Sequence, residues 1–138
     1  SSGERLNLLE LNNNVKVFNY GLGGSTESLY LTDSGAGSEV TKEKTDIKIS
    51  IKDITEVIKD FDIEKIDLLK LNIEGSEYDL LEKLLKSGLI STIDKLQIQF
   101  HENINDADLR RDRIRRDLNT THKEVWSYYM VWERWDKK

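Results

Sequence analysis

Polar residues follow an almost continuously apolar run, residues 66–73, and they are the first candidates for chemistry. Gly75 comes directly after this run and allows a tight strand-to-helix turn, because glycine has no Cβ to clash. Such a turn would present Asn72 and Glu74 at the tip of a buried strand, next to the N-terminus of a helix. A carboxylate in that place can accept a proton or position a hydroxyl group. The plainer alternative is a well-capped strand–turn–helix connection without a site.

His101 is the second candidate, since it follows residues 96–100, which have the pattern of a strand. An imidazole beyond a strand end is well placed to act as a general base. A lone histidine without an identified partner is more often structural or solvent-facing, and that alternative stays open. The other histidine, His122, is expected at a helix end, where a cation is favoured by the helix dipole.

Strand and helix patterns alternate along the chain and must position these residues. Ile47, Ile49 and Ile51 alternate with polar residues, which is the period of a strand with one solvated face. Asp53 is expected as the N-cap of the following helix, with Glu56 three residues later to complete a capping box. The sequence predicts helices at 4–12, 53–61, 76–85 and 106–121, and strands at 15–20, 28–32, 47–51, 66–73, 96–100 and 125–135.

This alternation indicates an α/β fold with a mainly parallel sheet, because parallel strands need crossover connections that are usually helices. In open sheets of this kind, ligands bind beyond the carboxyl ends of the strands. Asn72, Glu74 and His101 each lie at or just beyond the end of a predicted strand, and Tyr20 ends the strand predicted at 15–20. These are the residues that such a fold would offer to a ligand.

The last two predicted elements are rich in charged and aromatic residues. In the helix at 106–121, arginines alternate with aspartates, which indicates a solvated helix with ion pairs and not a nucleic-acid-binding patch. In the last strand, Tyr129 and Glu133 are expected to border a pocket while their neighbours are buried. The expected inner face of the helix is Ala107, Ile114 and Leu118, and the expected core set of the strand is Trp126, Tyr128, Met130 and Trp132.

Composition excludes several classes of function. The chain has 138 residues, a formal net charge of −5, no cysteine and two histidines. The negative charge argues against nucleic-acid binding, which depends on clustered Lys and Arg. The lack of cysteine excludes disulfides and thiolate catalysis, and the histidines and carboxylates lack metal-ligand spacing. No apolar run approaches the roughly 18 residues of a membrane span, and no leader is recognised, so we expect a cytoplasmic protein.

A resemblance to a known family rests on residues 66–78. This segment resembles the hallmark of FkbM-type methyltransferases, which reads Asp-(apolar)2-Lys-(apolar)-Asp-(apolar)-Glu-Gly-(small)-Glu and leads into a leucine-rich helix. Residues 97–101, 126–135 and 19–22 are also similar to that family. The likeness extends from residue 4 onward, so residues 4–138 are interpreted as a single partial methyltransferase-like domain. The first residues, 1–3, are interpreted as a remnant of cloning.

The resemblance implies a Rossmann-like methyltransferase sheet and an enzyme that uses S-adenosyl-L-methionine. Such an enzyme transfers the methyl group to an oxygen, often a sugar hydroxyl, so the implied partner is a small-molecule or glycan acceptor. Under this interpretation Glu74 and His101 are the candidate catalytic residues, for proton abstraction or for positioning the acceptor. Tyr20 and Asn72 are the candidates for lining the cofactor or acceptor pocket.

Two departures from the family pattern limit this expectation. The glycine-rich loop and ribose-binding carboxylate of the family's first strands are not recognised, and the cluster at 21–24 precedes a strand pattern, not a helix. Without a helix N-terminus such a loop lacks a dipole end for a ligand, so the cluster is interpreted as a turn. Asn72 also stands at the family's acidic position, and an amide cannot act as a base. We therefore expect weak or no cofactor binding by this chain alone, and the alternative is a non-catalytic remnant or interaction module.

The sheet would then lack its first strands, which leaves the strand at 66–73 with an edge of unpaired backbone groups. Such edges tend to pair with other strands. We expect this edge to be covered either by the strand predicted at 15–20 or by a second copy of the protein, which would form a homo-oligomer.

Overall fold

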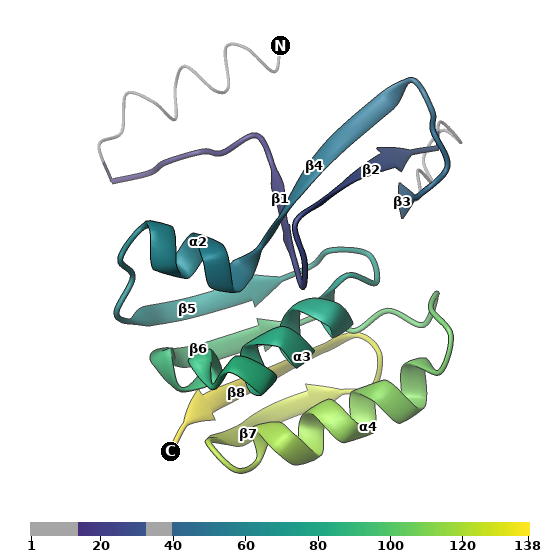
Figure 1. The fold of residues 1–138 in the computed structure, drawn as a ribbon. Coiled ribbons are helices and arrows are strands. Elements are labelled where there is room, and N and C mark those ends of the chain that lie inside the picture. Colours follow the sequence, from purple (N-terminus) through teal and green to yellow (C-terminus); the bar gives the residue numbers. More distant parts are fainter. Residues whose placement is uncertain (1–13, 33–39) are drawn as a thin grey trace.

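The computed structural model describes residues 14–32 and 40–138, which form two sheets with helices beside them (Figure 1). The strand order is β1-β4-β2-β3 in the first sheet and β5-β6-β8-β7 in the second. The strands of the first sheet are β1 (Gly21–Gly23), β2 (Glu27–Leu31), β3 (Val40–Thr41) and β4 (Ile47–Asp53). Those of the second sheet are β5 (Ile66–Leu71), β6 (Ile93–Ile98), β7 (His122–Tyr128) and β8 (Trp132–Lys137).

The fold is α/β, but both sheets are mixed, so the prediction of a mainly parallel sheet is wrong. Parallel pairing joins β1 to β4 and β5 to β6, whereas β2–β3, β2–β4, β6–β8 and β7–β8 are antiparallel. One reason is that the strand predicted at 125–135 is a hairpin, whose turn contains Met130 at a φ of 51°. Strands joined by a tight turn without a crossover helix run antiparallel.

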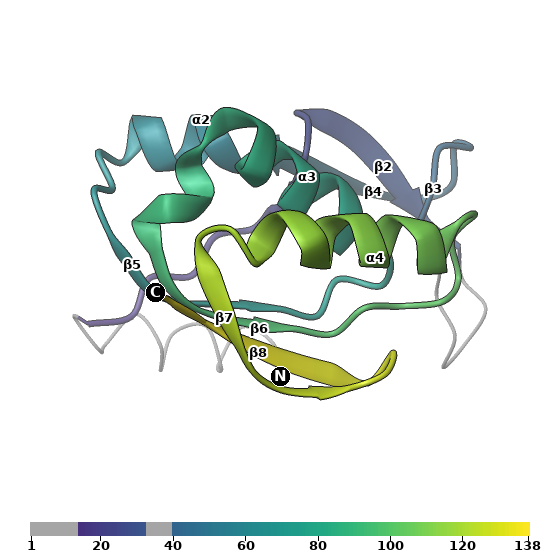
Figure 2. The same ribbon diagram turned by 90° about the horizontal axis from the view of Figure 1, so that it is seen from below.

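The helices cover one face of the second sheet. They are α2 (Ile54–Asp60), α3 (Glu77–Ser87) and α4 (Ala107–Leu118), with a short 3-10 helix, η2 (Leu89–Thr92), before β6. Figure 2 shows α2, α3 and α4 on the same side of the sheet. No helix in the described part of the chain is long and apolar enough to cross a membrane. The fully buried core between helices and sheet includes Tyr78, Leu81, Leu84, Leu96, Ile98, Ile114 and Leu118.

The caps of the helices follow the sequence only in part. Asp53 caps α2 as predicted, because its carboxylate accepts a hydrogen bond from the backbone N–H of Thr55 at 2.8 Å. Glu56 does not close the expected capping box. Its carboxylate instead accepts from the Thr26 hydroxyl at 2.9 Å, and the Asp53 N–H donates to that hydroxyl at 3.1 Å. Thr26, in the loop between β1 and β2, thus replaces the local partner that the motif predicts.

Residues 21–23 of the glycine cluster form a strand, so the prediction of a turn there is wrong, as is that of a strand at 15–20. β1 begins at Gly21 and pairs in parallel with β4. A Cβ added to Gly21 or to Gly23 would lie 2.7 Å from side-chain atoms of Ile51. The glycines therefore allow Ile51 to pack directly against the backbone of β1. The helix predicted at 4–12 lies outside the described residues.

The hairpin of β7 and β8 presents the opposite set of residues to the core from the one expected. Glu133 and Trp135 are buried and lie opposite Ile98 and Leu96 of β6. Because neighbours along a strand point to opposite faces, Trp132 and Arg134 lie on the face without helices. Of the expected core set of Trp126, Tyr128, Met130 and Trp132, only Met130 packs against the core, and Tyr128 is exposed.

β5 is an edge strand of the second sheet within the described chain. It pairs with β6 alone, and residues 15–20 form no strand beside it. The expectation that a strand at 15–20 covers this edge is therefore wrong. Leu71 at the end of β5 is buried, whereas Leu68 is exposed. The strand is therefore covered on its helix side only, although an almost continuously apolar strand is typically covered on both sides.

Candidate active site

Glu74 and His101 lie side by side beyond the ends of β5 and β6. These strands are parallel neighbours, so the loops that follow them leave the sheet at the same edge. His101 Nε2 is 3.5 Å from Glu74 Oε2. The side chain of His101 is 15% exposed and that of Glu74 is 65% exposed. The two catalytic candidates from the sequence therefore meet at a place that a ligand can reach.

Glu77 is the buried centre of this site, and it is not among the candidates predicted from the sequence. Its side chain is fully buried, and Oε1 accepts the backbone N–H of His101 at 2.7 Å and lies 3.0 Å from Nδ1 of the same residue. Oε2 accepts the backbone N–H of Gly75 at 2.8 Å. Two signals for Glu77 were available: it is the last acidic residue of the hallmark at 66–78, and it is the first residue of a helix, where the dipole favours a carboxylate.

Tyr78 fixes the other side of His101. Its hydroxyl donates to the His101 carbonyl at 2.7 Å. Burial, with a contribution from the charge of Glu77, raises the pKa of Tyr78. The hydroxyl therefore remains protonated and keeps its proton for this bond. Glu77 thus contacts the backbone N–H and the ring of His101, and its neighbour Tyr78 contacts the C=O.

The turn between β5 and α3 depends on left-handed backbone. Glu74 has a φ of 53° and Gly75 a φ of 108°, in agreement with the tight turn that the sequence predicts. The Asn103 side-chain amide donates to the Glu74 carbonyl at 3.1 Å. A Cβ on Gly75 would lie 2.9 Å from Ile104 Cγ2 and 3.0 Å from Asn103 Oδ1. The turn is therefore packed closely against the loop that follows His101.

The two residues proposed to line a cofactor or acceptor pocket lie in different places. Asn72 directly follows β5 and is exposed near Glu74 in the chain. Tyr20 precedes β1 in the first sheet, because the strand begins one residue after it instead of ending there. Its ring lies 4.4 Å from Lys52 Nζ and 5.5 Å from the ring of Phe18. Asn72 thus stays a candidate by position, whereas Tyr20 is at the wrong end of its strand.

A cavity of about 430 Å³ adjoins the loop after His101. Its lining includes Glu102, Ile104, Tyr129 and Met130, so Tyr129 borders a pocket as the sequence predicts. Glu133, the other residue expected there, is buried in the core. The cavity offers apolar surface, carboxylates and a phenol ring within a few residues of the candidate base.

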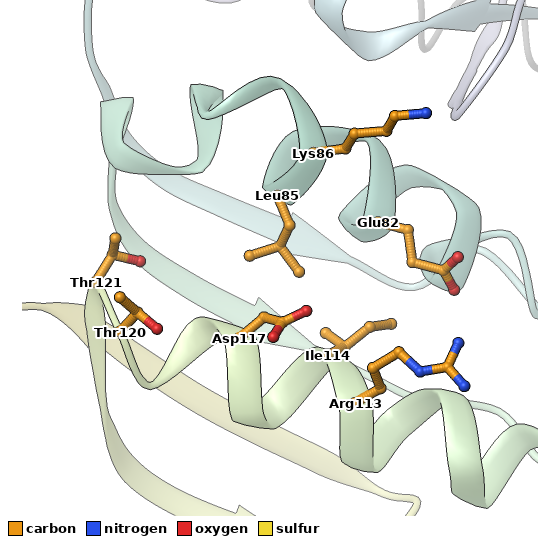
Figure 3. Close-up of a pocket in the computed structure, with 8 residues that line it drawn as sticks. All are labelled: Glu82, Leu85, Lys86, Arg113, Ile114, Asp117, Thr120 and Thr121. Carbon is orange, nitrogen blue, oxygen red and sulfur yellow. The ribbon is translucent and has the colours of Figure 1, made fainter.

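A second groove, of about 490 Å³, lies between α3 and α4 (Figure 3). Its lining includes Leu85 and Ile114 at the floor and Glu82 and Arg113 at the rim. It adjoins the later turns of both helices, whereas Glu77 is at the start of α3. The residues of the strand-end site, Glu74, Glu77 and His101, therefore do not line this groove.

The glycine cluster does not fit the cofactor loop of a methyltransferase. The space above Gly21 and Gly23 is filled by Ile51, and a Cβ on Gly24 would lie 2.6 Å from the backbone oxygen of Asp79. The chain then enters β2, so no helix directly follows the cluster in the sequence, as it would in such a loop. Among the described residues, no cluster of His, Cys, Asp or Glu side chains is suited to hold a metal ion.

Comparison with known proteins gives one match. The model of the methyltransferase FkbM domain matches residues 5–134. A search of curated proteins and a search of solved structures each found no match. The matched segment spans both sheets and contains the strand-end site with Glu74, Glu77 and His101. The chain therefore belongs to the FkbM methyltransferase family.

Proposed function

We propose that this chain provides the acceptor side of an S-adenosylmethionine-dependent O-methyltransferase. The acceptor is a hydroxyl group of a small molecule or glycan, with a sugar hydroxyl as the first choice. The observation that carries the proposal is that His101 and Glu74 lie side by side beyond the carboxyl ends of the paired strands β5 and β6. Family membership supports methyl transfer, and the pair supplies a base for the proton that the acceptor must lose.

For this reaction the protein must mainly align the acceptor oxygen with the methyl carbon and provide a proton acceptor. When the acceptor oxygen takes the methyl group, the bond from that methyl group to the donor sulfonium would break and S-adenosylhomocysteine would be released. The acceptor hydroxyl loses its proton in the same step, and a base within hydrogen-bond reach would accelerate it. His101 Nε2 is the atom assigned to take the proton. Glu74 lies 3.5 Å from that atom, so its carboxylate stabilises the resulting imidazolium or orients the acceptor hydroxyl.

The remaining assignments are to binding. Asn72 cannot act as a base, but its amide can donate to or accept from a ligand at the tip of β5. The cavity beside Tyr129 has room for the body of an acceptor whose reacting hydroxyl reaches His101. S-adenosylmethionine is the donor that the family suggests. Since the glycine cluster does not form its loop, we expect the chain alone to bind it with a dissociation constant weaker than about 10 μM, or −7 kcal/mol.

Methyl transfer from S-adenosylmethionine at millimolar concentration to a panel of methyl glycosides tests the proposal. We expect His101→Ala to lower the rate roughly 10²-fold or more, because a positioned base contributes about 10²–10⁴. His122→Gln is the matched control, since that histidine lies at the start of β7 and not at the strand-end site. Unchanged transfer by His101→Ala, or no transfer by the unmodified chain, would contradict the proposal. Absent transfer would favour the alternative of a non-catalytic interaction module.

A further inference from the structure

We propose that Glu77 is a positioning residue that holds His101 as the tautomer with its proton on Nδ1, so that Nε2 faces the acceptor as a proton acceptor. The inference rests on the proposed function only where it says that the lone pair of Nε2 takes the proton of the acceptor. The tautomer itself is a property of the chain and can be measured without donor or acceptor.

The surroundings of Glu77 favour an ionised carboxylate in an enclosed place. The side chain is fully buried, and burial of a charge is costly unless hydrogen bonds replace the lost water. Here N–H groups converge on it from Gly75 at 2.8 Å and from the His101 backbone at 2.7 Å, and His101 Nδ1 adds a contact at 3.0 Å. Its two oxygens thus join the loop after β5 to the loop after β6.

The tautomer follows from the chemistry of this contact. An ionised carboxylate has no proton to give, so a hydrogen bond at 3.0 Å requires the proton on His101 Nδ1. In a neutral imidazole the other nitrogen is then unprotonated. Nε2 points toward the exposed carboxylate of Glu74, on the side that solvent and a ligand can reach. A base oriented by a buried acid in this way has its free lone pair where the reaction needs it.

A purely structural role for Glu77 is the competing explanation. The carboxylate satisfies backbone N–H groups of Gly75 and His101, and that alone would stabilise both loops. The two explanations differ in one measurable respect. If Glu77 positions the ring, the tautomer of His101 depends on it. If Glu77 only joins the loops, the tautomer is independent of it.

His122 provides an internal reference with the opposite tautomer. Its Nε2 lies 2.7 Å from the carbonyl oxygen of Ile93, and a carbonyl can only accept. Nε2 of His122 therefore carries the proton, while Nδ1 lies 2.8 Å from the Thr121 hydroxyl. The two histidines of the chain thus differ in protonated nitrogen, and one spectrum contains both.

The inference is tested by long-range proton–nitrogen correlation NMR on protein whose histidine ring nitrogens are isotope-labelled. The spectrum is recorded at a pH at which both rings are neutral. In the unmodified chain we expect a protonated Nδ1 for His101 and a protonated Nε2 for His122. In Glu77→Gln we expect His101 to lose its single tautomer, because one amide cannot accept on both of its atoms. His122 should be unchanged, which shows that the variant is folded.

Tyr78→Phe is the matched control. It removes the hydrogen bond to the His101 carbonyl from the same turn of α3 but leaves the ring contact, so the Nδ1-protonated form should persist. The inference is overturned if His101 in the unmodified chain carries its proton on Nε2, or if Glu77→Gln keeps the original tautomer. The first of these outcomes can be read even if Glu77→Gln does not fold.

Activity adds a readout that a structural role would not produce. In the methyl-transfer assay we expect Glu77→Gln to lower kcat roughly 10-fold or more, within the range that a base contributes, with little change in KM for the acceptor. If the unmodified chain transfers no methyl group, the proposed function fails and the tautomer assignment is still decided by the spectrum. If transfer occurs but kcat is unaffected by Glu77→Gln, the positioning role fails while the proposed function stands.

Discussion

The guanidinium of Arg111 lies 2.9 Å from the carboxylate of Glu133, and the two side chains are only 8% and 1% exposed. Glu133 Oε1 also accepts from Arg115 at 2.6 Å and from the indole N–H of Trp135 at 2.8 Å. This cluster joins α4 to β8 across the inner face of the sheet. The predicted ion pairs of α4 are therefore made in part with a buried strand residue, and not only on a solvated surface.

Loss of Glu133 is expected to destabilise the fold strongly. Glu133→Ala would leave the Arg111 guanidinium buried without its anion, which costs about 3–5 kcal/mol when one member of a buried pair is removed. The Arg134–Asp136 pair of β8 lies on the more exposed face, so Asp136→Ala should cost less than about 1 kcal/mol. Chemical denaturation of both variants measures the difference. Equal losses in the free energy of unfolding would show that the buried Arg111–Glu133 pair stabilises the fold no more than the exposed pair.

Substitution of Gly75 tests the turn that carries Glu74. Gly75→Ala forces an L-residue to a φ of 108° and drives its Cβ to 2.9 Å from Ile104, so we expect a loss of roughly 2–4 kcal/mol. Gly88→Ala is the control, because Gly88 has a φ of 79° with nothing within 4 Å of an added Cβ. It should lose roughly 1–2 kcal/mol from backbone strain alone. Identical denaturation midpoints would mean that Ile104 does not contact this turn.

The stability of the fold should fall in mild acid through His122. Burial lowers the pKa of His122, with Lys137 acting in the same direction while the bond to Ile93 and the carboxylates of Asp136 and Asp94 oppose it. Because the folded pKa lies below the unfolded value of about 6.5, protonation favours the unfolded chain. The stabilisation is complete above pH ~6.5 and is lost as the pH falls below it. Denaturant unfolding between pH 5 and 7.5 should show a steeper pH dependence for the unmodified chain than for His122→Gln.

The free edge of β5 should pair with a second copy of the protein. Within the described chain β5 has one strand neighbour, and unpaired backbone groups at such an edge attract another strand. We expect light scattering to show concentration-dependent association, with amide exchange slowed at residues 66–71. Leu68→Lys places a charge beside the edge, next to exposed apolar surface, and should weaken association. A monomer at all concentrations with fast exchange in β5 would contradict the prediction.

Local patterns in the sequence determined most of the elements and half of the candidate site. The period of Ile47, Ile49 and Ile51 predicted β4, and the apolar run before Gly75 predicted β5 and the turn after it. Glu74 and His101 were chosen because each follows a strand, and the parallel pairing of β5 with β6 places them side by side. These features depend on residues close in sequence, whose backbone preferences and periodicity are visible without a fold.

The remaining features were decided by tertiary structure, because each depends on a partner distant in sequence. Glu77 gains its importance only when the loop after β6 brings His101 to it, 24 residues later. Arg111 has helical spacing to the inner-face residue Ile114, yet only Glu133 on β8 explains why a charge can be buried there. The glycines of β1 are explained only by Ile51, which fills the space beside them. Strand direction and buried charge pairs depend on residues that are neighbours in space but distant in sequence. Local sequence patterns therefore do not predict them.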